Sequence, residues 1–262
     1  MLTGFSEDLQ AISKSRKTTI INGKLKRLHV NIATLQETHL ADSGSLKKKD
    51  CTFFWQGKSS NELCQHRVGF TVKNSLLNMV EPGSNGSKRL LTLHLKTTAG
   101  PVILVSMYTS THSATPDTMD KFYDKLATTI SSILRKDKLV ILGNFNTGVG
   151  ADHDSSHLGQ FGVDKMNDNG QRLLELCTYH NFCIANSFFR TKTQHKVCWR
   201  HPCSKHWHQL DLILVRRAII KNVLHTCSYY SADCGTYHSL VCWKIKLQPK
   251  RFHCGKKLEM LT

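Results

Sequence analysis

The sequence predicts an α/β sandwich, in which two β-sheets stack face to face with helices on the outside. Three observations lead to this fold class: strand-like segments outnumber helix-like ones, the two kinds alternate irregularly, and no internal repeat or linker is visible. A chain of 262 residues suits one large domain, although two small domains would also fit. We take residues 1–248 as one domain and residues 249–262 as a basic, flexible tail.

The first part of the chain changes from helical to strand periodicity. Residues 5–29 carry apolar side chains near helical spacing, although Asn22-Gly23 weakens the middle. The strands that follow end in a pair joined by turn residues 97–101, which predicts a hairpin. These strand patterns cover residues 30–35, 51–55, 68–72, 89–96 and 102–108.

The second part alternates helices and strands. Thr115, followed by Pro116 and Asp117, marks a helix start, and an amphipathic helix also follows Asn169-Gly170. Residues 151–166 are polar and predict a long loop. Strand patterns cover residues 139–146, 182–185, 209–215 and 239–247.

The segment 139–150 is the centre of the predicted site. Four apolar residues form a strand buried on both faces, and two amides, Asn144 and Asn146, follow it. In an extended chain these amides point one way and Phe145 points the other way, into a core. Polar side chains at the end of a buried strand build sites in α/β folds. An ordinary Asn/Gly turn would give the same pattern.

Two carboxylates also stand at notable places. Glu37 directly follows the strand at 30–35, so it is either a metal ligand or base, or an exposed loop residue. Asp211 lies inside an apolar run and therefore needs a partner, because burying an unpaired carboxylate is costly.

Charge indicates the class of partner. The chain has 36 Lys and Arg against 19 Asp and Glu, a net charge of +17. This favours a polyanion, nucleic acid before anionic membrane, although it also fits a merely soluble basic surface. Trp199, Arg200 and Trp207 combine aromatic rings with a cation, which suits base stacking and phosphate contact, although half-buried loop aromatics are also common.

The cysteines and the ends of the chain indicate the compartment. There is no apolar run of membrane-span length and no signal-peptide layout at the N-terminus. We therefore expect an intracellular protein, nuclear rather than cytoplasmic, that is not secreted and does not bind a membrane. The ten Cys contain no Cys-x-x-Cys pair and predict free thiols. One group close in sequence could suggest zinc, but its spacing matches no standard finger: Cys198, Cys203, His206 and His208.

Five motifs now occur in order along the chain. They are Leu-Gln-Glu-Thr (35–38), Ser-Met-Tyr (106–108), Gly-Asn-Phe-Asn (143–146), Gln-Leu-Asp-Leu-Ile (209–213) and Tyr-His-Ser (237–239). Together they resemble the endonuclease/exonuclease/phosphatase family, whose pattern is Gln-Glu, a Tyr, Gly-Asp-Phe-Asn, Leu-Asp and Asp-His. Longer phrases resemble craniofacial development protein 2-like sequences and the endonuclease domains of LINE-type retrotransposons, from which the resemblance implies descent.

The resemblance implies a four-layered α/β sandwich, two mixed sheets flanked by helices, that hydrolyses DNA phosphodiesters with Mg²⁺ and no small-molecule cofactor. Carried over by position, Glu37 would hold the metal, Tyr108 would contact the scissile phosphate, and Asn146 would orient phosphate or nucleophile. Asp211 would pair with His238, because a carboxylate orients an imidazole and makes it more basic. We expect a monomer.

The departures from the family pattern concern catalysis. Asn144 replaces the Asp of Gly-Asp-Phe-Asn, and Tyr237 replaces the Asp before the His. The resemblance also implies a first core strand ending in Trp-Asn-Val-Arg-Thr, and we expect that strand and its metal-binding Asn to be missing here. Losing a general base removes on the order of 10²–10⁴ in rate. We therefore expect little or no hydrolysis and weak or absent Mg²⁺ binding. The alternatives are a non-catalytic, basic nucleic-acid-binding module and a copy that does not fold stably.

Overall fold

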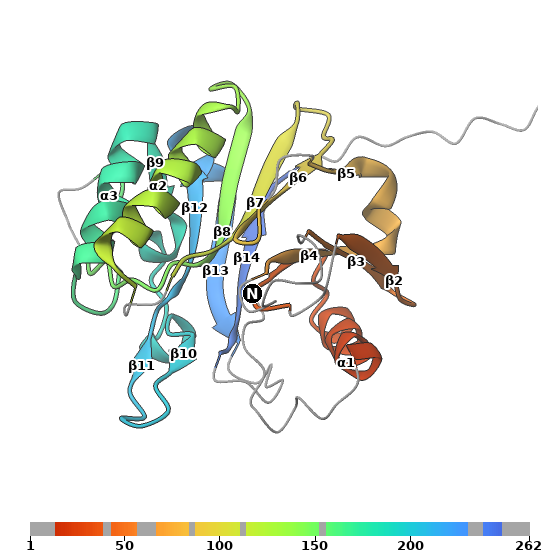
Figure 1. Ribbon diagram of the computed structural model, residues 1–262, viewed down its shortest axis with the longest axis horizontal. Helices are drawn as coiled ribbons and strands as arrows, with labels where there is room; N and C mark the ends of the chain where they lie inside the picture. The colour runs from red at the N-terminus through yellow and green to blue at the C-terminus, as the bar shows by residue number, and fades with distance from the viewer. Residues whose placement is uncertain are drawn as a thin grey trace, which may run out of the picture.

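The structure is a computed structural model that describes residues 14–38, 43–56, 67–83, 87–110, 114–151, 156–229 and 238–247. These residues form layers of helices and sheets (Figure 1). Helices α2 and α3 cover one face of a six-stranded sheet, further strands pack on its other face, and α1 lies outside those strands. The predicted sandwich of sheets with outer helices is confirmed. The predicted tail at 249–262 lies outside the described residues.

The six-stranded sheet is the centre of the fold. Its two middle strands, β7 and β8, are parallel, and the other neighbours are antiparallel, so the sheet is mixed. The predicted hairpin is the pair β6–β7. In sheet order the strands are β5 (Val80–Pro82), β6 (Leu90–Leu95), β7 (Val102–Tyr108), β8 (Lys138–Asn144), β12 (Asp211–Arg216) and β9 (Phe182–Ile184).

Helices α2 (Pro116–Ser131) and α3 (Asp168–His180) pack their apolar sides on this sheet. Helix α2 starts where the sequence predicts, because the Thr115 side chain accepts a hydrogen bond from the amide of Thr118 and proline occupies the first turn. Helix α2 connects the parallel strands β7 and β8, which need a crossover of this kind.

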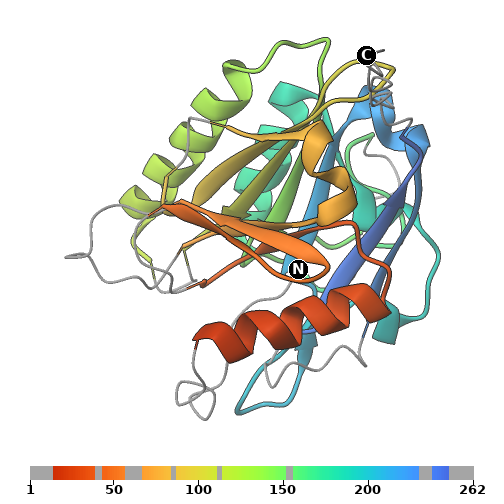
Figure 2. The ribbon, with the colours of Figure 1, turned by 90° about the vertical axis from the view of Figure 1, so that its right-hand side faces the viewer.

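The second layer consists of two separate pieces. A four-stranded antiparallel sheet has the order β1 (Ile32–Leu35), β4 (Gly69–Lys73), β3 (Cys51–Trp55) and β2 (Gly44–Lys47). Beside it runs an antiparallel pair, β13 (Val223–Tyr229) and β14 (Leu240–Ile245). Helix α1 (Lys14–Arg27) packs against both pieces, as Figure 2 shows.

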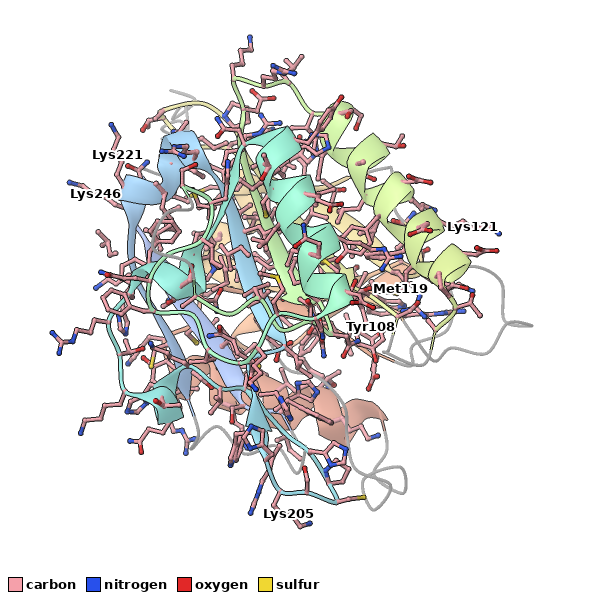
Figure 3. The ribbon with its side chains drawn as sticks, turned by 90° about the vertical axis from the view of Figure 1, so that its left-hand side faces the viewer. Tyr108, Met119, Lys121, Lys205, Lys221 and Lys246 are labelled. Carbon is pink, nitrogen blue, oxygen red and sulfur yellow. The ribbon has the colours of Figure 1, made fainter. Side chains whose placement is uncertain are left out.

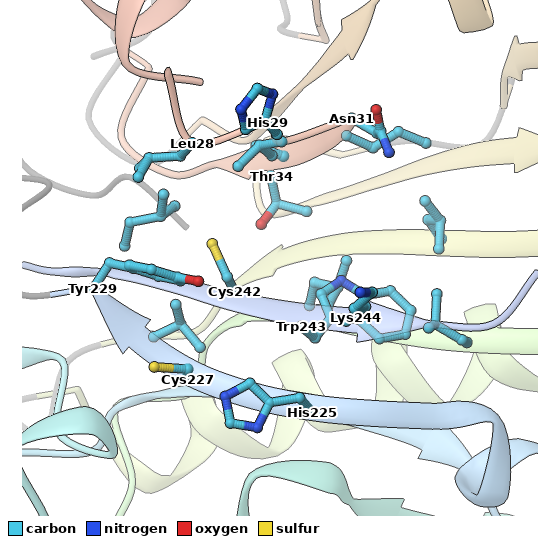
Figure 4. A pocket seen from close by; sticks show the side chains of 18 of the residues that line it. Leu28, His29, Asn31, Thr34, His225, Cys227, Tyr229, Cys242, Trp243 and Lys244 are labelled. Carbon is cyan, nitrogen blue, oxygen red and sulfur yellow. The ribbon is translucent and has the colours of Figure 1, made fainter. Parts of the chain in front are cut away.

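A cavity of about 590 Å³ separates these two pieces (Figure 4). Thr34 of β1 lies on one side, and Trp243 of β14 lies on the other. Among the described residues β1 pairs only with β4, and β14 pairs only with β13. Within the part of the chain that the structure describes, the second layer is therefore interrupted between β1 and β14.

The remaining elements are short. Strands β10 (Trp199–Arg200) and β11 (Trp207–His208) form a hairpin with Lys205 at its tip, which projects from the sheets (Figure 3). Among the described helices, none has the length and apolar character needed to cross a bilayer. Short 3₁₀ helices cover Asn74–Met79, Ala185–Phe188, Thr193–His195 and Arg217–Asn222.

Candidate functional site

Three of the predicted site residues lie in one row across the six-stranded sheet. Tyr108 at the end of β7 is in register with Asn144 at the end of β8, and Asn144 is in register with Asp211 at the start of β12. Residues in register on neighbouring strands point to the same face. All three are buried, and their row lies at the carboxyl ends of the parallel strands, where α/β folds place their sites.

Glu37 joins this row from the other layer. The Tyr108 hydroxyl donates a hydrogen bond to Glu37 Oε1 at 2.5 Å, which ties the end of β1 to the six-stranded sheet. Burial, followed by the charge of Glu37, raises the pKa of Tyr108 well above its usual 10.0. Tyr108 therefore stays protonated at neutral pH and acts as a donor.

Arg89 is a neighbour of this pair that the sequence did not indicate. Its Nη1 donates to the Tyr108 carbonyl at 3.2 Å, and its guanidinium carbon lies 5.5 Å from the centre of the Tyr108 ring. Burial lowers the pKa of Arg89, while the charges of Tyr108 and Glu37 act to raise it. The arginine places a positive charge beside the Glu37 carboxylate.

Asp211 has the partner that its burial required. His238 Nδ1 lies 3.1 Å from Asp211 Oδ2, and the Asp211 side chain is fully buried. Asp211 Oδ1 has no hydrogen-bond partner among the described residues. The pairing of Asp211 with His238 agrees with the sequence-based prediction, whereas Tyr237 lies outside the described residues.

Cys198 supports the Asp211–His238 pair from behind. Its buried thiol accepts hydrogen bonds from the amides of Leu210 and Asp211, both at 3.2 Å, and its carbonyl accepts the amide of Ser239 at 2.6 Å. Burial, followed by the charge of Asp211, raises the pKa of the Cys198 thiol well above its usual value. Cys198 therefore acts as a buried hydrogen-bond acceptor that fixes the backbone before Asp211.

The two amides after β8 are held by each other and by nearby backbone. The Asn146 amide N–H donates to Asn144 Oδ1 at 2.8 Å, and Asn146 Nδ2 donates to the carbonyls of Thr109 and Ser110 at 3.2 and 3.3 Å. Phe145 is fully buried, as predicted. The strand nevertheless ends at Asn144, and Asn146 turns left-handed with a φ of 46°, so the extended segment predicted through 146 is wrong.

The β10–β11 hairpin reaches the site through Trp199. Trp199 forms an isolated β-bridge with His238, and the two ring centres lie 6.2 Å apart. On the same hairpin the guanidinium carbon of Arg200 lies 5.9 Å from the centre of the Trp207 ring. Trp199 is therefore close to the predicted catalytic pair, whereas Arg200 and Trp207 contact each other on the hairpin.

The residues present fit a magnesium ion only in part. Glu37 and Asp211 are the carboxylates near Tyr108, and they are engaged by Tyr108 and His238. Among the described residues, no group of three or more His, Cys, Asp and Glu side chains gathers around Glu37. Mg²⁺ is commonly held by one or two carboxylates with waters and substrate phosphate. The arrangement therefore provides few ligands of its own for the ion.

Comparison with known proteins adds sequence relatives. No protein-family model matches the chain. Craniofacial development protein 2 of Bos taurus is 24% identical over 234 residues, and its homologue in Tragulus javanicus is also 24% identical over 234 residues. The match covers 89% of this chain but only 39% of the length of the Bos taurus protein.

Solved structures add the fold. The Xenopus laevis APE2 catalytic domain has a TM-score of 0.68 at 16% identity, covering 89% of this chain and 88% of that one. The endonuclease domain of TRAS1, a telomere-specific non-LTR retrotransposon, has a TM-score of 0.63 at 13% identity, covering 88% and 93%. AP endonuclease LMAP of Leishmania major scores 0.66 at 13% identity, covering 88% and 83%. The chain therefore has the α/β sandwich fold of the endonuclease/exonuclease/phosphatase family and is similar in sequence to craniofacial development protein 2.

Proposed function

We propose that this chain binds DNA with a site of the phosphodiesterase type and hydrolyses it weakly or not at all. The observation that carries the proposal is the place of Asn144. It stands between Tyr108 and Asp211 in the row across the sheet, and its Oδ1 already accepts the amide of Asn146. An amide cannot take a proton from water near neutral pH, so the row lacks a base at its centre.

The other residues keep roles in binding and orientation. Asp211 holds Nδ1 of His238 and thereby orients the imidazole beside the row of Tyr108, Asn144 and Asp211. Tyr108 donates to Glu37 and would donate to a phosphate oxygen that displaces this contact. Mg²⁺, where bound at Glu37, would offset negative charge on the phosphate. The similar solved structures include an AP endonuclease and a 3' phosphatase bound to a product DNA hairpin, which supports DNA as the ligand.

Nicking of supercoiled plasmid by the purified chain tests this proposal. We expect no nicking in Mg²⁺ above the level in EDTA or the level of a His238→Ala variant. Metal-dependent nicking by the parent that His238→Ala abolishes would refute impaired catalysis. Circular dichroism melts of both proteins, run in parallel, establish that each is folded.

A non-catalytic binding role is the second candidate, and the hairpin favours it. Arg200 packs near Trp207, and the chain carries a net charge of +17. Phosphate contact and base stacking by these groups do not require a site that cleaves the DNA. Salt titration of DNA binding, with cleavage assayed in parallel, separates the candidates. For a non-catalytic binding protein, the logarithm of the DNA affinity falls linearly with the logarithm of the salt concentration, and no cleaved DNA forms. Affinity that does not change with salt would contradict a phosphate-contacting surface.

A further inference from the structure

Asp164, His206 and His208 come together where the β10–β11 hairpin meets the loop that precedes α3. One ligand atom from each lies within 4.8 Å of the ligand atoms of the other two. His208 belongs to β11, His206 to the turn before it, and Asp164 to the loop that precedes α3. We propose that these three side chains bind a transition-metal ion, zinc first, that clamps the hairpin to this loop.

The distances suit a small tetrahedral ion. Zinc ligands at 2.0–2.2 Å from the metal stand roughly 3.3 Å from one another. His208 Nδ1 and Asp164 Oδ1 are already 3.5 Å apart. The rings of His206 and His208 have centres 4.7 Å apart, and His206 is exposed, so its ring is free to turn toward the ion.

Asp164 is held in place by its surroundings. Its Oδ2 accepts the amide of Gln209 at 2.8 Å, which leaves Oδ1 directed at His208. Its backbone has a φ of 67°, a left-handed conformation that is uncommon outside glycine. Strained backbone of this kind persists where surrounding contacts fix it, and it gathers at functional positions. A second-sphere hydrogen bond to a ligating carboxylate is the usual support of a metal site.

The ligand types select the metal. Two imidazoles and one carboxylate suit zinc, copper or nickel, whereas Mg²⁺ takes oxygen ligands. Zinc sites with three protein ligands keep a fourth position for water. This centre is separate from Glu37 and does not depend on the proposed nuclease-type function.

The clamp would act on the part of the hairpin that contacts His238. His208 is in register with Trp199, and their ring centres lie 5.7 Å apart. Trp199 in turn forms a β-bridge with His238. A metal ion on His208 therefore fixes the strand that places Trp199 beside His238.

Calorimetric titration of the whole chain with Zn²⁺ tests the site. We expect one zinc per chain, and His206→Ala and Asp164→Asn should each weaken binding at least tenfold. The matched control is Cys203→Ser, because Cys203 is exposed on the same hairpin and offers the competing thiol ligand. It should bind zinc as the parent does, and millimolar Mg²⁺ should not displace the ion.

Two results would overturn the proposal. One is zinc binding that survives Asp164→Asn and His206→Ala but is lost in Cys203→Ser, which would assign the ion to thiols. The other is a parent that binds no more zinc than His206→Ala does. Hydrogen exchange supplies a second readout. Zinc should slow exchange at the hairpin amides 199–208 in the parent and not in Asp164→Asn. An equal effect of zinc on these amides in the two proteins would contradict the clamp.

Discussion

Restoring an acid at position 144 should place two carboxylates face to face. Asn144 and Asp211 are directly opposite each other on β8 and β12, and both are buried. Opposed side chains on neighbouring strands have Cβ atoms about 5 Å apart. Two unit charges at that distance repel by about 3 kcal/mol at an effective dielectric constant of 20. Asn144→Asp keeps the size of the side chain and its acceptor for the Asn146 amide, so this repulsion should dominate.

A double-mutant cycle measures the repulsion. We would measure the free energy of unfolding by urea denaturation at pH 8 in EDTA for the parent, Asn144→Asp, Asp211→Asn and the double variant. The cycle removes the separate effect of leaving His238 without its carboxylate. We expect a coupling energy of about 3 kcal/mol, as estimated above, with Asn144→Asp less stable than the parent. A coupling energy below about 0.5 kcal/mol would refute the reasoning, because mutations at independent sites add to within that margin.

The pH dependence of the stability of Asn144→Asp tests independently whether the two carboxylates repel each other. Repulsion raises the pKa of one carboxyl in the folded state above its usual value of about 3.9. The folded state then holds its proton to higher pH than the unfolded chain does. The deficit in stability should therefore vanish below about pH 4 and grow as the pH rises. Added Mg²⁺ should reduce the deficit if the restored carboxylate completes a metal site.

Three further predictions concern other parts of the chain. Arg200→Ala should weaken DNA binding and lower the slope of log affinity against log salt by about 1, measured by fluorescence anisotropy; an unchanged slope would remove Arg200 from the phosphate contacts. Arg216 donates to three carbonyl oxygens just beyond α2, so Arg216→Met should lower unfolding free energy by roughly 2–4 kcal/mol, while Arg217→Met, which removes one exposed contact, should change it little. Burial, followed by the charge of Asp50, raises the pKa of Cys51 from 9.0 to about 11, so the free energy of unfolding should fall as pH rises from 9 toward 11. Alkylation at pH 8 should reach exposed Cys203 before Cys51, and equal labelling of these two thiols would contradict this.

Local chemistry made part of the fold predictable. The α2 start followed from Thr115 and Pro116, whose capping and fixed φ act within one turn. The burial of Phe145 and the need of Asp211 for a partner followed from single-residue energetics. These effects depend on neighbours in sequence or on the cost of burial alone, so they can be predicted from the sequence.

Other elements were hidden because their pattern is not apolar. Strand β2 is exposed at every position, and β13 buries polar Thr226 and Ser228 on its inner face, so neither shows alternation. The place of Arg89 beside Tyr108 depends on the register of β6 and β7. The meeting of Asp164 with the hairpin histidines depends on how two loops pack. Contacts of this kind are set by tertiary structure and carry no mark in sequence spacing.

The cavity beside β14 has a consequence for how the site holds together over time. In the described chain the β13–β14 pair makes no backbone ladder with the four-stranded sheet, and side-chain packing is the main restraint across the cavity. Elements held by side chains alone tend to open locally before the rest of a protein unfolds. His238 lies two residues before β14, and its own segment is also held to the β10–β11 hairpin by the bridge to Trp199 and by the Ser239 amide on the Cys198 carbonyl. An opening of β14 that also broke these two contacts would take the imidazole away from Asp211, so we expect the Asp211–His238 pair to last as long as this segment stays docked.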